Sequence, residues 1–520
     1  MSIKNIEQNL NSSPSVGPGP MDPECSVPGS ERGMSNPDAR SEGSTISARQ
    51  EEKPFTNTEK VRPLSTSQET SSEGSCSTDL PAQKPEKPQS ASQWGIRRIL
   101  IFTVYRILFS VVFLTNIAAA IALLVRQEKS RSHSLVNFTT AATANLTVAI
   151  LIRQPYIING LYDICRFALS SAPLRVRYQF AYLYEFGGVH SGSAVCSVIW
   201  FIIFTVYLTK ESVKGNISDP ALLVLNYLLL SLLLSIVITA LPQVRYRYHN
   251  AFENVHRFAG WSALALFWVY LALFAKSTNA MNKEALGYTL IKLPAFWFLI
   301  IASIHAIYPW MMLRRIPVRA ERLSKHVLRL HHTKNVSRLR GFAISDAPLR
   351  EWHTFACIPA RDGERGGSMI IANAGDWTRK TINNPRSYYY VRGIPSTGLL
   401  SMALMFKRVV IVATGSGIGP CLAVMFDLPK SSCRVIWSTP APEATFGKEL
   451  ISDVKEVDPD AIIYDTTALG RPDLVQMAYD LYISSGSDAV FCISNKTVTG
   501  KVLLGLRGRG VHAYGPIWDS

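Results

Sequence analysis

The chain has 520 residues, of which 47% are hydrophobic and 18% are charged, and its formal net charge is +16. This length leaves room for two or three domains, and the low charge content indicates membrane segments. No zinc-finger or basic-zipper pattern accompanies the positive charge, and the eight cysteines show no CxxC spacing. We therefore expect no nucleic-acid partner, no disulfide framework and no zinc site.

The first segment, residues 1–94, is rich in Ser, Pro, Gly and Glu and has hardly any aromatic residue. Such a segment buries too little apolar surface to offset the entropy of ordering, so it is predicted to be a disordered cytosolic tail. It also lacks the apolar core of a signal peptide.

A transmembrane domain is predicted over residues 95–322, because six apolar runs approach the ~20 residues that span a bilayer. The runs are Leu100–Val125, Leu135–Ile152, Ser193–Thr209, Leu222–Leu241, Val255–Ala275 and Leu290–Leu313. The second run is the weakest, because it carries several threonines and an asparagine.

Basic residues assign the sides of this predicted six-helix transmembrane bundle. Arginines cluster before the first run, after the second, between the fourth and fifth, and after the sixth, at Arg97, Arg98, Arg153, Arg166, Arg175, Arg177, Arg245, Arg247, Arg314, Arg315, Arg319 and Arg322. By the positive-inside rule these segments are cytosolic, so both termini face the cytosol. We expect an integral protein of the plasma membrane, in contact with membrane lipid.

The composition changes after residue 322 to short strands and polar turns. The first half, residues 323–404, has β runs whose spacing predicts a small β-barrel: Val336–Ile344, Trp352–Ile358, Ser368–Ala372 and Tyr388–Val391. The second half, residues 405–520, alternates strand and helix and is predicted to be a doubly wound α/β domain. Its expected strands are Val409–Val412, Arg434–Trp437, Ala461–Tyr464 and Ala489–Ile493, with helices from Cys421, Gly447 and Asp473.

A glycine turn follows the first strand of the α/β domain. Val409–Val412 runs into a turn that contains Gly415, Gly417, Gly419 and Pro420, and a helix follows. A strand, a glycine turn and a helix N-terminus let backbone N–H groups and the helix dipole meet a pyrophosphate. The next strand ends in Trp437-Ser438-Thr439, with no acidic residue to bind a ribose 2′-hydroxyl, which favours NADPH over NADH.

These motifs resemble a known superfamily. The turn Gly415-x-Gly417-x-x-Pro420 has the form found in ferredoxin reductases, and Trp352-His353-Thr354-Phe355-Ala356 resembles the His-Pro-Phe-Thr flavin motif of ferric reductases and NADPH oxidases. Gly375-Asp376-Trp377-Thr378 resembles their second flavin motif, and Gly470-Arg471-Pro472-Asp473 a Gly-Arg-Pro element of their nucleotide domain. With six predicted spans ahead of residues 323–520, residues 95–520 resemble the ferric-reductase/NADPH-oxidase superfamily. Within it, the chain resembles the fungal membrane flavoproteins of the TmpA type at Gly187-Gly188-Val189-His190-Ser191-Gly192, at Val255-His256-Arg257-Phe258 and at the ending Tyr514-Gly515-Pro516-Ile517-Trp518-Asp519-Ser520.

The resemblance implies cofactors and site residues. His353, Thr354 and Phe355 would lie along FAD, Gly375 and Thr378 would hold its phosphates, and NAD(P)H would bind the glycine turn and Arg471. Cys492 stands where reductases carry the Cys of a Cys-Gly-Pro motif near the nicotinamide, and a buried structural cysteine is the alternative. Trp518 would cover the flavin ring, and a packed surface tryptophan is the alternative. The chain departs from the motifs at Thr354, at Ala356, where a hydroxyl is usual, and at Ser494-Asn495, which replace Gly-Pro.

Two histidines in the spans suggest a single haem. His190 and His256 begin the third and fifth spans, at similar depth near the cytosolic face, so that their imidazoles could ligate one iron axially. Superfamily members with two haems repeat each histidine deeper in the same spans, where this chain has Phe201 to Phe204 and Trp268 to Tyr270. The alternative is a pair of histidines that hydrogen-bond at the membrane edge.

The sequence therefore predicts a membrane flavoprotein that passes electrons from NAD(P)H through FAD to an unknown acceptor at the membrane. Without the second, deeper pair of histidines there is no haem to carry electrons across the outer half of the membrane. An acceptor at the cytosolic face or a lipid-soluble one such as a quinone therefore fits best. One alternative is a degenerate nucleotide-binding sensor or scaffold. The others are a ferric-reductase-like transmembrane electron transporter and, more remotely, a solute transporter.

Overall fold

The computed structural model describes residues 101–126, 132–217, 219–279, 285–337, 339–360 and 365–517. The tail expected at 1–94 and the side chain of Trp518 lie outside the described residues.

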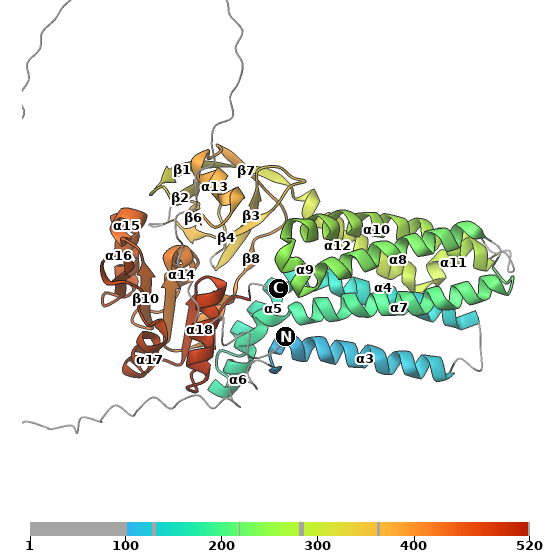
Figure 1. The fold of residues 1–520 in the computed structure, drawn as a ribbon, viewed down its shortest axis with the longest axis horizontal. Coiled ribbons are helices and arrows are strands. Elements are labelled where there is room, and N and C mark those ends of the chain that lie inside the picture. Colours follow the sequence, from blue (N-terminus) through green and yellow to red (C-terminus); the bar gives the residue numbers. More distant parts are fainter. Residues whose placement is uncertain are drawn as a thin grey trace, which may run out of the picture. The chain divides into compact units, whose positions relative to one another are not determined.

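Long apolar helices run side by side in one bundle (Figure 1). They are α3 (Val104–Arg126), α4 (Ser132–Leu151), α7 (Gly187–Val213), α8 (Pro220–Ala240), α10 (His249–Asn279) and α12 (Pro294–Met311). Within the described part of the chain, five helices are long and apolar enough to cross a membrane. The second expected span, Leu135–Ile152, is counted as a sixth only if α4 from Leu135 and α5 (Pro155–Ala168), which are bent by 69° at their junction, form one span.

Helix α7 is the central helix of the bundle. It packs against α3, α4 and α8, and over half of its most apolar stretch is buried. Large aromatic side chains fill the core here, with Phe201 and Phe204 of α7 fully buried against Phe267 and Tyr270 of α10.

The segment between the second and third expected spans, residues 155–185, is called the linker here, and it packs against the module formed by residues 314–517. It forms α5, α6 (Leu174–Phe180) and the 3-10 helix η2 (Ala181–Glu185). The Asn159 side chain on α5 donates to the Pro395 carbonyl (2.9 Å) and accepts from the Thr397 N–H (2.8 Å). The Tyr514 hydroxyl donates to the Tyr178 carbonyl (3.0 Å). These contacts connect both halves of the module to the linker.

The first half of the module is an eight-stranded antiparallel sheet whose path runs β4-β3-β7-β1-β2-β6-β5, with β8 paired to β3. The strands are β1 (Arg314–Arg322), β2 (Val327–His332), β3 (Arg340–Ser345), β4 (His353–Ala356), β5 (Ile358–Pro359), β6 (Gly367–Ala372), β7 (Tyr388–Val391) and β8 (Ser396–Thr397). Strand β1 extends the barrel ahead of the boundary expected at 322/323. Its four arginines are exposed, whereas Ile316 is buried in the barrel core, so the segment is a strand as well as a basic flank.

The second half is a parallel sheet in the order β11-β10-β9-β12-β13. Its strands are β9 (Val409–Thr414), β10 (Cys433–Thr439), β11 (Ile462–Asp465), β12 (Ala489–Ile493) and β13 (Ala513–Tyr514). Helices α14 (Ile418–Met425) and α15 (Pro442–Val457) cover one face, and α17 (Leu474–Ser485) and α18 (Lys496–Arg507) cover the other. Because side chains alternate across a strand, Ile411 packs under the first pair of helices and Val412 under the second. The predicted doubly wound α/β domain is confirmed.

Candidate functional site

The glycine turn between β9 and α14 is held from both sides. Gly415 has φ +51°, a conformation that side chains other than glycine rarely adopt, and its carbonyl accepts a hydrogen bond from Trp437 Nε1 on β10 (2.9 Å). On the other side, a Cβ on Gly417 would lie 2.4 Å from the Ile493 carbonyl oxygen at the end of β12. The backbone conformation therefore favours glycine at position 415, and close packing requires it at position 417.

This turn lies where the chain reverses its direction across the sheet. From β9 the chain passes to β10 and β11 on one side, and it then crosses to β12 and β13 on the other. In open α/β sheets, ligands bind at the carboxyl ends of the strands at such a switch point. The Thr414 hydroxyl at the end of β9 is hydrogen-bonded to the Ser494 hydroxyl after β12, so polar side chains edge the crevice.

Helix α14 begins directly at this turn and faces the barrel. Pro420 lies in its first turn, where a missing N–H costs no intrahelical hydrogen bond. A Cβ on Gly419 would lie 3.1 Å from the Ile370 side chain of β6, so the absence of a side chain lets the helix start approach the barrel. Arg329 of β2 adds ion pairs of 3.7 and 4.0 Å to Glu449 and Asp453 of α15. The glycine turn and the barrel are thus in direct contact.

Strand β4 presents the first flavin-like motif with a defined register. His353 and Phe355 pair with Ile344 and Phe342, whose side chains are buried in the barrel core. Consistent with this, the His353 ring stacks on Trp377 with centroids 4.3 Å apart, and Phe355 packs against the same indole. The opposite face of the strand carries the exposed Thr354 and the partly buried Ala356, which packs against the core cluster that includes α14. The outer face of β4 therefore bears small side chains, while the rings of His353 and Phe355 lie on the inner face.

The second flavin-like motif forms the start of α13 (Asp376–Asn383). The Thr378 hydroxyl accepts from the N–H groups of Ala374 (2.9 Å) and Gly375 (3.0 Å) and donates to the Gly375 carbonyl (2.9 Å). It thus caps its own helix. The first N–H groups of a helix have no intrahelical acceptor, and a Cβ on Gly375 would have no neighbour within 4 Å. This open, positively polarised helix start fits a phosphate.

Cys492 lies in the middle of the α/β domain. Its thiol is fully buried in the apolar cluster beneath α17 and α18. Burial raises the pKa of this thiol to about 12, although the Thr499 hydroxyl opposes the rise. This placement favours the structural alternative for Cys492, and its role beside a nicotinamide stays a prediction.

Arg471 lies in the loop before α17, after Gly470, whose φ is +74°. Its side chain is exposed. Its expected part in nucleotide binding stays a prediction, as does the flavin-covering role of Trp518, which lies outside the described residues.

The two bundle histidines lie close together. The rings of His190 and His256 have centroids 6.3 Å apart, at an interplanar angle of 35°. His190 Nδ1 is 2.8 Å from the Ala149 carbonyl, so it carries the proton and Nε2 is left as an acceptor. A metal-ligating histidine typically has this arrangement. His305 on α12 is instead hydrogen-bonded to Tyr156 on α5.

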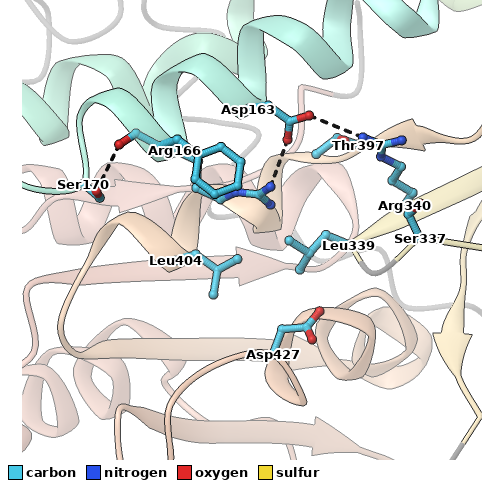
Figure 2. Close-up of a pocket in the computed structure, with 10 residues that line it drawn as sticks. Asp163, Arg166, Ser170, Ser337, Leu339, Arg340, Thr397, Leu404 and Asp427 are labelled. Carbon is cyan, nitrogen blue, oxygen red and sulfur yellow. Dashed lines mark hydrogen bonds and ion pairs between the residues drawn. The ribbon is translucent and has the colours of Figure 1, made fainter. Parts of the chain in front are cut away.

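A pocket of about 500 Å³ lies where α5 meets both halves of the module (Figure 2). The sequence analysis identified only the arginines of this linker. Asp163 of α5 pairs with Arg166 (2.9 Å) and with Arg340 of β3 (3.4 Å), while Leu404 and Asp427 lie across the pocket. Asp163 thus shares its single negative charge between the two arginines, and Asp427 adds a second carboxylate to the lining of the pocket.

Comparisons with known proteins give relatives of a defined kind. Residues 399–520 match the family described as the C-terminal domain of adenylate-forming reductase 03009. Two Coprinopsis cinerea proteins, adenylate-forming reductases 03009 and 06235, are 42% and 40% identical over 84% and 85% of this chain. The chain spans 42% of the length of each of these relatives.

Solved reductases resemble the soluble module at low scores. A ferredoxin NADP+ reductase from Neisseria gonorrhoeae with bound FAD and NADP is 10% identical, with a TM-score of 0.33, over 39% of this chain and 98% of its own. Phthalate dioxygenase reductase is 16% identical, with a TM-score of 0.30, over 39% of this chain and 67% of its own.

Proposed function

We propose that this protein is a membrane-bound oxidoreductase that uses NAD(P)H and FAD and delivers electrons to an acceptor at the cytosolic side of the membrane. The observation that carries the proposal is the glycine turn at the switch point of the sheet, with Gly417 against β12 and Gly419 against the barrel strand β6. Both relatives are named reductases, which agrees with electron transfer.

Different elements of the chain would bind the two cofactors. The turn Gly415–Gly417 would bind the pyrophosphate of NAD(P)H through its backbone and the start of α14. The start of α13 would hold the FAD phosphates, and the outer face of β4 at Thr354 would lie along the flavin. When bound, FAD accepts a hydride and releases electrons singly or in pairs.

A single haem between His190 and His256 is a secondary proposal. The ring spacing of 6.3 Å and the free Nε2 of His190 support it. Deeper in the bundle, Phe201, Phe204 and Tyr270 pack together and supply no nitrogen ligand.

The competing function is a nucleotide-binding sensor that has lost flavin chemistry. The observation that favours it lies on β4, where His353 and Phe355 face the barrel core and Ala356 lacks the usual hydroxyl. A TmpA-type assignment and a plasma-membrane location remain part of the proposal.

The absorption spectrum of the full chain purified in detergent tests these functions. A flavin band that NADPH bleaches is the result expected of the oxidoreductase. NADPH binding without a flavin band would overturn the proposal in favour of the sensor. A Soret band that disappears in His190→Ala and His256→Ala would establish the haem, and a chain without this band has none.

A further inference from the structure

An apolar groove opens on the outer surface of the helix bundle, between α10 and α12. It has a volume of about 400 Å³ and is lined by Trp261, Leu264, Ala265, Trp268, Ser303, Ala306, Ile307 and Trp310. Two lining side chains, Ile307 and Trp261, are 55% and 37% exposed. In a membrane, this groove faces lipid.

The groove has rigid aromatic walls and one polar point. Trp261 of α10 meets Trp310 of α12 edge to face, with centroids 5.3 Å apart. Trp268 Nε1 donates to the Ser303 hydroxyl (2.9 Å), which fixes the deeper wall. Trp261 and Trp268 are seven residues apart, so the groove extends about 10 Å along α10. Flat faces of this kind, spaced by small residues such as Ala306, suit a planar ring rather than a flexible chain.

The shallow end of the groove adjoins the predicted flavin strand. Trp310 lies at the end of α12, just before β1, and its ring packs edge to face on Trp352, with ring centroids 6.3 Å apart. Trp352 directly precedes His353 of β4. A ring bound in the groove is thus separated from the flavin strand by two tryptophan side chains.

A cation lies at the same end. The Arg392 guanidinium lies 4.6 Å from the Trp310 ring centroid and 4.5 Å from that of Trp352. It forms no ion pair with a carboxylate in the described part of the chain. Burial and the nearby Arg257 lower the pKa of Arg392 to about 10, which leaves it charged at neutral pH. An uncompensated charge here attracts a group that becomes negative on reduction.

We propose that this groove binds the electron acceptor, a lipid-soluble quinone, with its ring between the Trp261–Trp310 pair at one end and Trp268 at the other, and a carbonyl toward Arg392. The inference rests on the proposed function, whose acceptor it names. In the net reaction NADPH gives up a hydride, and the quinone gains two electrons and two protons to become the quinol. One proton is carried by the hydride, and the other comes from cytosolic water at the shallow end of the groove, beside Trp310. NADP+ is the second product.

The test uses the full chain in lipid nanodiscs, with decylubiquinone as the probe. Ala306→Phe fills the groove, and Ala119→Phe places the same ring on the exposed face of α3 as the matched control. Quenching of tryptophan fluorescence by decylubiquinone reports binding, and NADPH oxidation with decylubiquinone or soluble ferricyanide reports activity. The expected result is saturable quenching and quinone reduction, both weakened about tenfold or more in Ala306→Phe alone, with ferricyanide reduction unchanged.

The outcomes separate the two proposals. Equal quenching and equal quinone reduction in wild type and Ala306→Phe would overturn the groove as the binding site. Non-saturable quenching, the behaviour of lipid that merely fills the surface, would overturn it too. If NADPH oxidation fails with both acceptors, the oxidoreductase proposal fails, and the quenching measurement still decides whether the groove binds a quinone.

Discussion

Replacing Gly417 by alanine tests whether the glycine turn binds NADPH. The added Cβ would lie 2.4 Å from the Ile493 carbonyl oxygen, whereas ordinary contact begins at 3.4 Å, so the turn must move about 1 Å away from β12. Forced overpacking of this kind costs about 1–3 kcal/mol. NADPH would have to restore the original turn, and each 1.4 kcal/mol weakens binding about tenfold. We therefore expect a Kd for NADPH that is about ten to a hundred times higher.

The assay is a titration of the purified full chain with NADPH, followed by nucleotide fluorescence. Gly500→Ala is the matched control, because its Cβ meets nothing within 4 Å in the middle of α18. There alanine favours the helix by about 0.5–1 kcal/mol, and NADPH binding should not change. A Gly417→Ala protein that is folded, as judged by its thermal transition, and binds NADPH within a factor of about two of wild type would refute this account of the turn.

Three further predictions concern single side chains. Thr378→Val removes the hydroxyl that caps α13, so it should lower the free energy of unfolding by about 1 kcal/mol and weaken FAD retention. Thr378→Ser keeps the hydroxyl and should preserve both. Equal behaviour of the two variants in thermal unfolding and flavin release would contradict this role. Cys492 should resist alkylation by N-ethylmaleimide at neutral pH in the native chain, because its thiol is buried and its pKa is raised to about 12, and rapid labelling in mass spectrometry would show instead that it reaches the crevice. His512 stacks on Tyr178, and burial, with Arg507 as the second cause, lowers the pKa of its imidazole. The contribution of the neutral imidazole to the free energy of unfolding is therefore fully present above the ordinary pKa of 6.5 and is lost as the pH falls through the lowered pKa. His512→Phe should flatten the dependence of thermal stability on pH in that range, and an unchanged profile would exclude this group.

Much of the soluble module could be predicted from local sequence. The strands at Tyr388–Val391 and Ala489–Ile493 have the bounds that the sequence indicated, because short runs of aromatic and β-branched residues between polar turns favour a strand. Strand β1 was harder to predict. The same arginines that mark a cytosolic flank also occupy exposed positions of a strand, and only pairing with β2 and β7 distinguishes a strand from a basic flank.

Some of the predicted site residues likewise follow from local sequence, and others depend on tertiary packing. A glycine turn is a local feature, so its place after β9 followed from sequence alone. The directions in which the side chains of Cys492 and His353 point did not, because the two faces of a strand differ only in what packs against them. The linker helix α5 also gave no local signal of its contacts with Pro395 and Thr397, which are more than two hundred residues away.

The sequence by itself determined the apolar helices, the barrel followed by an α/β domain, and the glycine turn with its strand and helix. These follow from hydrophobic period and backbone conformation, which neighbouring residues set. Only the tertiary structure decided that Gly417 touches β12, that Trp310 meets Trp352 beside β4, and that a groove opens between α10 and α12. Such contacts join residues distant in the chain, and they depend on how whole elements pack.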